Sequence, residues 1–110
     1  MNANCNNSKF MNSSFVNSNI KNASFKNAIL SNSRFDKARL DGIDFSYCDL
    51  REVSFWETEF KGEIILDQAI ISTLNWFEEL EKQKATGINI VLNQYQIIPK
   101  HDYFILLKIK

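Results

Sequence analysis

The chain is short of the residues on which disulfide scaffolds, metal centres and phosphate-binding loops depend. Among its 110 residues are two cysteines, one histidine, three glycines and one proline. Cys5 and Cys48 are too few for a disulfide-rich scaffold or a zinc cluster. The three glycines are isolated from one another, so a glycine-rich phosphate loop is missing. We therefore predict no cofactor and no metal site.

Long apolar runs and an excess of charge of one sign are also missing. No apolar stretch approaches the roughly 18 residues of a membrane-spanning helix, and the first residues lack the basic start and apolar run of a signal peptide. Lys and Arg total 13, as do Asp and Glu, so the formal net charge is zero. A dedicated nucleic-acid binder should be basic, so direct nucleic-acid binding is not expected. These features favour a cytoplasmic protein without a membrane segment.

Residue sets that could perform catalysis are not recognisable in the sequence. The one histidine, His101, lies in a Pro-Lys-His-Asp segment between two apolar runs. Its neighbour Asp102 is better explained by the composition of a turn than by a catalytic pair, because no nucleophile accompanies the two. We predict that the protein is not an enzyme and assign no catalytic residue.

What the sequence does contain is a repeat of five residues. Written in fives, residues 1–60 read MNANC, NNSKF, MNSSF, VNSNI, KNASF, KNAIL, SNSRF, DKARL, DGIDF, SYCDL, REVSF and WETEF. All twelve blocks end on an apolar residue, and the third residue of the first eight is Ala or Ser. Twelve matches in one register indicate an internal repeat.

A period of five residues fits neither regular element. On an α-helix a step of five turns through about 500°, which spreads the apolar residues over every face. On a flat strand an odd step alternates between the two faces. The chain must therefore bend once per repeat to return each apolar residue to one interior.

The second residue of each block suits such a bend. It is asparagine in the first seven blocks and glycine at Gly42, and both residues tolerate the positive φ that a type II turn requires. Other residues occupy the position in four later blocks: Lys37, Tyr47, Glu52 and Glu57. We expect type II turns in the first half of the repeat and less regular turns at these four later positions.

The segments NASF, NAIL and KARL closely resemble the pentapeptide-repeat family, whose pattern is a small residue, any residue, then Leu or Phe at every fifth position. The resemblance covers residues 2–61. It implies an all-β solenoid, a right-handed quadrilateral parallel β-helix of about three coils with four repeats per coil. Residues twenty apart should then stack in four interior columns. The expected core residues are Phe10, Phe15, Ile20, Phe25, Leu30, Phe35, Leu40, Phe45, Leu50, Phe55 and Phe60.

The repeat is predicted to stop at Glu63, which would occupy an inward position where an unpaired carboxylate is costly. We therefore divide the chain into a β-helix over 1–62 and a C-terminal cap over 63–110. At the other end the repeats begin with the first residues, and we expect no cap before them. Either the first coil frays, or it stacks on a partner, or the chain is the end of something longer.

The cap is predicted to contain a helix over about 67–84, begun at Asp67 and ended before Gly87. Two strands should follow, over about 88–98 and 103–109. A solenoid end must be covered, and the helix is the expected cover. Its apolar contacts are predicted to be Ile70, Leu74, Phe77 and Leu80.

Two strands alone are marginal in water, so they must pack on the cap, on the coil or on another copy of the chain. Some dimeric members of the family pair through their C-terminal segments, which implies a homodimer built from these strands. The alternative is a hairpin folded back on its own cap. The candidate interface residues are Trp56, Tyr95, Ile97, Tyr103, Phe104 and Leu106.

The sequence favours a non-enzymatic interaction or scaffolding module with an unknown protein partner. The resemblance implies an alternative, because the best-known family members imitate duplex DNA and bind DNA gyrase, protecting it from quinolones or toxins. Residues 41–63 hold seven acidic and two basic residues, whereas residues 1–40 hold one acidic and six basic. The acidic segment is short, which weakens that alternative. A bacterial effector or immunity protein is a further alternative without specific support.

Overall fold

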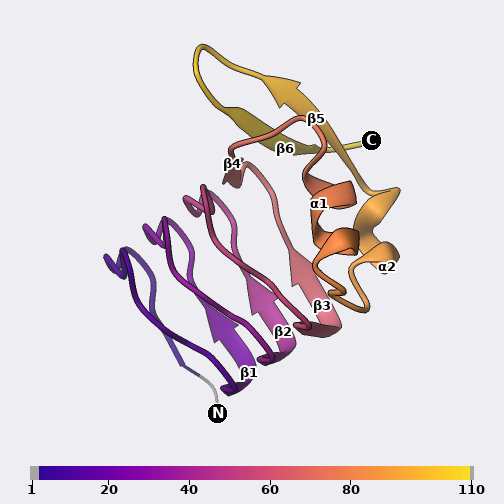
Figure 1. The fold of residues 1–110 in the computed structure, drawn as a ribbon. Coiled ribbons are helices and arrows are strands. Elements are labelled where there is room, and N and C mark those ends of the chain that lie inside the picture. The colour runs from indigo at the N-terminus through magenta and orange to yellow at the C-terminus, as the bar shows by residue number, and fades with distance from the viewer. Residues whose placement is uncertain (1–2, 110) are drawn as a thin grey trace.

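The computed structural model describes residues 3–109; Asn2, the first predicted turn asparagine, lies outside these residues. Three parallel strands, β1 (Asn19–Ser24), β2 (Arg39–Asp44) and β3 (Glu59–Ile65), form a sheet in the order β1-β2-β3. In Figure 1 each strand belongs to one circuit of the chain, and the circuits stack side by side from the N-terminus onward. The structure therefore has the β-rich fold of stacked parallel strands that the family resemblance implies.

The register between circuits advances by twenty residues. Ile20 pairs with Leu40, which in turn pairs with Phe60. Elsewhere on the stack Lys9 bridges to Ile29 in the same parallel sense. Because twenty residues are four repeats, equivalent residues of successive circuits lie above one another and the apolar block ends meet in one interior.

Every turn of the described repeats contains a residue with positive φ. Six asparagines, from Asn7 to Asn32, have φ between 51° and 63°. The expectation of less regular later turns is wrong, because Lys37, Tyr47, Glu52 and Glu57 have φ of 60°, 58°, 60° and 54°. Hydrogen bonds between coils impose this geometry: Lys37 N donates to Trp56 O at 2.7 Å. They offset a conformational cost of roughly 1 kcal/mol at each non-glycine residue.

The interior of the stack is filled by the residues that end each block. Phe35 and Phe55 are fully buried, whereas Phe10 and Phe15 in the first coil are only partly buried. The rings of Phe15, Phe35 and Phe55 stack along one column, with centroids 4.7 Å and 5.6 Å apart. The following predicted core residues are buried: Ile20, Phe25, Leu30, Phe35, Leu40, Phe45, Leu50, Phe55 and Phe60.

The repeat does not stop at Glu63; it slips by one residue. The register between β2 and β3 shifts after Asp41, so that Ile43 pairs with Ile64. Glu63 is therefore exposed, and Ile64 takes the inward position with 5% exposure. This β-bulge removes the buried carboxylate that an unbroken five-residue phase would create.

Beyond the bulge the five-residue spacing resumes one position later. Leu66, Ile71 and Trp76 lie five residues apart and all three are buried. Asp49 bridges to Ile70 as it bridges to Ile29 in the preceding coil. The stack therefore continues past the predicted boundary at residue 62.

The predicted helix over 67–84 is wrong in its first half. This part of the chain forms β4 (Ile70–Ile71), and α1 spans only Trp76–Lys82. Leu50 N donates to Ile70 O at 2.8 Å, so the edge of the third coil holds the segment as a strand before a helix can begin.

The predicted cap contacts are divided accordingly. Ile70 is half-buried in β4, and Leu74 is 63% exposed because it lies in the turn before α1. Phe77 and Leu80, on α1, are buried.

The first predicted strand of the cap, 88–98, begins as a helix. α2 spans Asn89–Leu92, and β5 follows at Tyr95–Pro99. β6 (Phe104–Lys108) lies within its predicted range and forms the centre of an antiparallel sheet in the order β4-β6-β5. Figure 1 shows α1 and α2 at the end of the stack farthest from the N-terminus.

The cap docks on the last coil through a close approach at Gly87. This residue has φ of +83°, and a Cβ there would lie 1.9 Å from the Phe60 carbonyl oxygen. We expect Gly87→Ala to lower the free energy of unfolding by about 3 kcal/mol, because the backbone of one segment must move. Urea denaturation measures this loss.

Gly42→Ala is the matched control. Its φ is +79°, but a Cβ there would meet the Asn22 side-chain oxygen at 2.6 Å, and that side chain can rotate. We expect a loss of about 1 kcal/mol from the backbone conformation alone. Equal losses in the two variants would contradict the close docking at Gly87.

Candidate functional site

The six predicted interface residues differ in exposure. Trp56 is 50% exposed, so the C-terminal strands do not cover it. Tyr95 and Leu106 are buried at 5% and 0% exposure, and their assignment to an interface is wrong. The remaining three are half-buried: Ile97, Tyr103 and Phe104.

Tyr95 is buried because it joins the cap to the stack. Its hydroxyl donates to the Asp67 carboxylate at 2.5 Å and accepts from Leu66 N at 3.0 Å. Burial and the Asp67 hydrogen bond raise the pKa of Tyr95 to about 12. Tyr95 of β5 therefore packs against the end of the stack of its own chain.

Trp56 lies on the outside of the stack, held there by the pairing between coils. Lys37 N donates to Trp56 O at 2.7 Å, and Glu57 N donates to Gln83 O of the cap at 2.8 Å. The backbone on both sides of the exposed ring is thus fixed. A partner would meet a preformed surface and would not need to order a loop.

A buried carboxylate lies beside Trp56. Asp36 is 6% exposed, and its carboxylate accepts hydrogen bonds from Arg34 Nε at 3.0 Å and from the Ser54 hydroxyl. Burial by itself raises the pKa of Asp36, but the bonds from Ser54 and Arg34, the Arg34 charge and the Trp56 backbone N–H outweigh it, so the pKa lies below its ordinary value.

Sequence reasoning missed Asp36, although a signal existed. Arg34 precedes it by two residues, and Ser54 stacks directly on Arg34 in the next coil. The register of twenty residues therefore places the Arg34 cation and the Ser54 hydroxyl next to this carboxylate. The Arg34 side chain remains 63% exposed and keeps part of its guanidinium at the surface.

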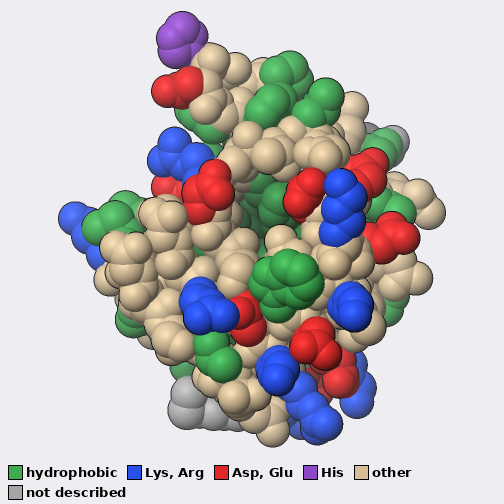
Figure 2. Space-filling model, viewed as in Figure 1, with side chains coloured by type: hydrophobic (Ala, Val, Ile, Leu, Met, Phe, Trp, Pro, Cys, Tyr) green, Lys and Arg blue, Asp and Glu red, His purple; other side chains and the backbone are tan. Residues whose placement is uncertain are grey.

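We define the Trp56 surface as Trp56, Arg34 and the two exposed corner residues Lys37 and Glu57. It combines an exposed aromatic ring with charges of both signs. Figure 2 shows one face of the molecule, on which hydrophobic groups lie among basic and acidic side chains. Trp and Arg are enriched at the energetic centres of protein interfaces.

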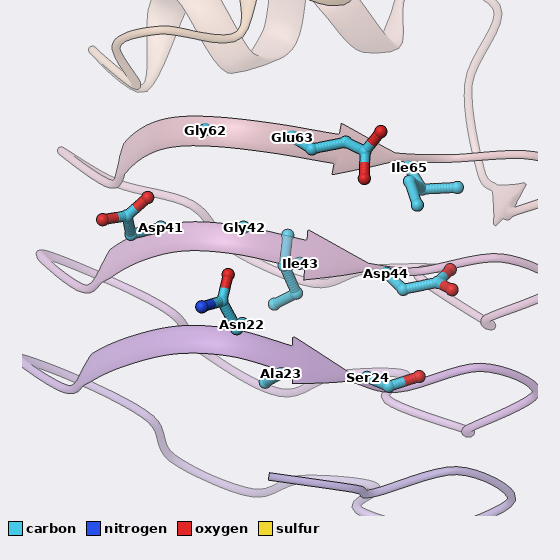
Figure 3. Close-up of a pocket in the computed structure, with 10 residues that line it drawn as sticks. All are labelled: Asn22, Ala23, Ser24, Asp41, Gly42, Ile43, Asp44, Gly62, Glu63 and Ile65. Carbon is cyan, nitrogen blue, oxygen red and sulfur yellow. The ribbon is translucent and has the colours of Figure 1, made fainter. Parts of the chain in front are cut away.

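A shallow groove of about 290 Å³ crosses the β1-β2-β3 sheet, as Figure 3 shows. Asp41 lies toward one end of the groove, and Asp44 and Glu63 lie toward the other. Within residues 3–109 no three His, Cys, Asp or Glu side chains gather as metal ligands. The groove thus lacks the convergent polar groups of a typical ligand site.

The remaining reactive side chains are dispersed over the molecule. Cys48 is fully buried, and burial raises its pKa above the ordinary value. Cys5 is half-buried in the first coil, and His101 is exposed between β5 and β6. None of the helices described in residues 3–109 is long and apolar enough to cross a membrane.

Stacked parallel circuits built from a five-residue unit define a repeat protein whose side chains project from regular faces. The family model for the pentapeptide repeat region matches residues 1–63. The match covers more than half of the chain, and the protein belongs to the pentapeptide repeat family, which confirms the resemblance predicted from the sequence. Comparison with curated proteins gave no match.

The buried Asp36 carboxylate, paired with the exposed Arg34, predicts how stability depends on pH. A carboxylate whose pKa is depressed by folding stabilises the folded state above its unfolded pKa of about 3.9 and loses this contribution as the pH falls through the folded value. We expect Asp36→Asn to cost about 1–3 kcal/mol at neutral pH. Its stability should also fall less steeply than that of the wild type below about pH 5.

Denaturant unfolding between neutral and acid pH measures both effects. Glu81→Gln, at an exposed position of α1, is the control and should behave as the wild type. An Asp36→Asn variant whose stability runs parallel to the wild type at every pH would contradict the assignment.

Proposed function

We propose that this protein is a non-enzymatic interaction module and that the Trp56 surface contacts a protein partner. The observation that carries the proposal is the 50% exposure of a Trp side chain on a rigid, hydrogen-bonded face. When a partner covers such a ring, the removal of apolar surface from water contributes roughly 25 cal/mol of binding free energy per Å². The exposed part of Arg34 adds donors suited to a carboxylate or backbone carbonyl of the partner.

The DNA-mimic alternative has less support. Three acidic residues of the stack are held in ion pairs: Asp49 with Arg51 at 2.8 Å, Glu59 with Arg39 at 3.8 Å, and Asp36 with Arg34. Together with the zero net charge, these pairs leave less unbalanced negative charge than an imitation of duplex DNA requires.

A homodimer through the C-terminal strands remains a narrower proposal. In the order β4-β6-β5, the central strand is β6, and β5 is the strand that borders the sheet without a second partner among the described residues. A dimer of this type would pair β5 with β5 of a second copy.

We also propose that the architecture is a right-handed quadrilateral parallel β-helix of about three coils. The register of twenty residues supports it, because a positive-φ turn at every fifth residue leaves four straight segments per circuit. The bulge at Glu63 and the cap residues that pair with the third coil extend this geometry at the C-terminal end.

Deletions test the number of repeats per coil. Removing residues 21–40 takes out one whole circuit and leaves Ile20 able to stack under Phe60, so we expect a cooperatively folding protein with a β-type circular dichroism spectrum. Removing 21–35 takes out three repeats and moves each later column by one side, so that Leu40 and not Phe45 stacks on Cys5. We expect that variant to be less stable than the 21–40 variant. A 21–35 variant that is more stable than the 21–40 variant would contradict the four-sided architecture.

Trp56→Ala tests the interaction surface. We expect its free energy of unfolding to stay within about 1 kcal/mol of the wild type, because half of the ring is already in water. Proteins retained from a cell extract by immobilised wild type should be lost with Trp56→Ala and identified by mass spectrometry.

The matched control is Tyr47→Ala, which removes a ring of 54% exposure from another turn. It should retain the same proteins as the wild type. If Trp56→Ala retains every protein that the wild type does, the Trp56 surface is not the contact.

A further inference from the structure

The two helices of the cap enclose a groove on the surface of the molecule. Its volume is about 480 Å³. α1 contributes Phe77, Glu78 and Glu81 to the lining, α2 contributes Leu92, and the segment 85–88 joins the two helices. Figure 1 shows α1 and α2 next to each other at the capped end of the stack. The groove is therefore a feature of the cap and not of the repeat.

The segment that joins the helices is held to the third coil by backbone hydrogen bonds. Phe60 N donates to Thr86 O at 2.8 Å, and Thr86 N donates to Thr58 O at 2.9 Å. The next residue, Gly87, packs directly against the Phe60 carbonyl group. This part of the groove is fixed to the stack, so a ligand would meet a preformed site and would not have to order it.

Much of the lining is apolar. Phe77 and Ile88 belong to the buried core, and Ala85 is half-buried against it. Leu92 also lines the groove, yet its side chain is 44% exposed. Water in the groove therefore contacts apolar surface. A ligand with an apolar body that covers Leu92 would release this water, which favours binding.

The charge of the lining has one sign. Glu78 and Glu81 are exposed, and their spacing of three residues places both on one side of α1. Within residues 3–109 neither forms an ion pair, since the pair on α1 joins Lys82 to Glu79 at 3.7 Å. The described lining contains no Lys or Arg. Two carboxylates at this spacing repel each other, so a cation bound between them would be stabilised by both.

The size of the groove indicates a small ligand. Sites for small molecules enclose roughly 300–1,000 Å³ and combine an apolar lining with a few polar groups. The groove, at about 480 Å³, falls in this range. An amphipathic helix of a partner would instead need apolar anchors spread over about two turns, whereas Leu92 is the exposed apolar residue of the described lining.

We propose that the groove between α1 and α2 binds a small organic cation. This ligand is an amine whose apolar body covers Leu92 and whose ammonium group lies between the carboxylates of Glu78 and Glu81. The carboxylates select a cation over neutral and anionic molecules of the same shape. Because the groove is open to water, the dissociation constant is modest, about 0.1–1 mM. The site shares no residue with the Trp56 surface or with β5, and the proposal does not depend on a protein partner.

Three probes with the same apolar body test the proposal: phenylbutylamine, phenylbutanol and phenylbutyrate. At neutral pH they are cationic, neutral and anionic. Two-dimensional NMR of the full chain follows binding at each backbone amide. We expect the amine to shift the amides of residues 77–92, the alcohol to bind there about fivefold more weakly, and the carboxylate to bind more weakly than the alcohol. Equal affinities of the amine and the alcohol overturn the proposal, as do shifts only outside 77–92 or no shifts up to about 10 mM amine.

Glu78→Gln combined with Glu81→Gln tests the role of the carboxylates. We expect this double variant to bind phenylbutylamine about fivefold more weakly and phenylbutanol with unchanged affinity, because only the charge is lost. The matched control is Glu52→Gln with Glu63→Gln, which removes the same charge from exposed positions of the stack and should leave both affinities unchanged. If the two double variants weaken the amine equally, general attraction to the chain holds the cation, and the proposal is overturned.

Leu92→Ser tests the role of the apolar lining. We expect it to weaken the binding of phenylbutylamine and phenylbutanol alike, by about three- to fivefold, because both probes cover the same side chain. Unchanged binding by the folded variant overturns the placement of the ligand. If circular dichroism shows that Leu92→Ser does not fold, the probe series on the wild-type protein decides.

Discussion

The parallel pairing of each residue with the residue twenty positions later is the constraint on which the rest of the structure depends. It imposes positive φ on Lys37 and Glu57 although neither favours it. It also places Ser54 beside the Asp36 carboxylate, which no local sequence contact could do. The same hydrogen bonds hold the backbone that carries the exposed ring of Trp56. A surface built in this way is rigid because every coil determines the next.

The last coil of a stack must find partners for its backbone groups and cover for its apolar core. At the C-terminal end the bulge at Glu63 delays the repeat by one residue, and the cap then supplies partners such as Ile70 and Thr86. Although the net charge of the chain is zero, the three coils differ in charge: residues 1–20 are nearly uncharged, 21–40 are basic and 41–60 are acidic.

Family membership accounts for the stack, whereas function depends on what the regular faces display. The pentapeptide repeat match ends at residue 63, and the features that distinguish this chain lie outside the repeat rule. Trp56 occupies a block position for which the repeat sets no preference, and Asp36 is buried at the equivalent position one coil earlier. Interaction surfaces of such proteins therefore have to be found from side-chain environment and not from the repeat itself.

The sequence by itself determined the period, the turn positions and the inward residues, because each five-residue unit meets the same local requirement for a turn and one apolar side chain. Only the tertiary structure decided where that pattern slips and how the stack ends. Residues near Ile70 became a strand and not a helix because Leu50 N, far away in the sequence, required an acceptor. Tyr95 became core because its hydroxyl meets Asp67. These outcomes depend on backbone groups of the last coil that need hydrogen-bond partners. Because those groups lie far away in the sequence, local patterns near residues 70 and 95 do not predict the contacts.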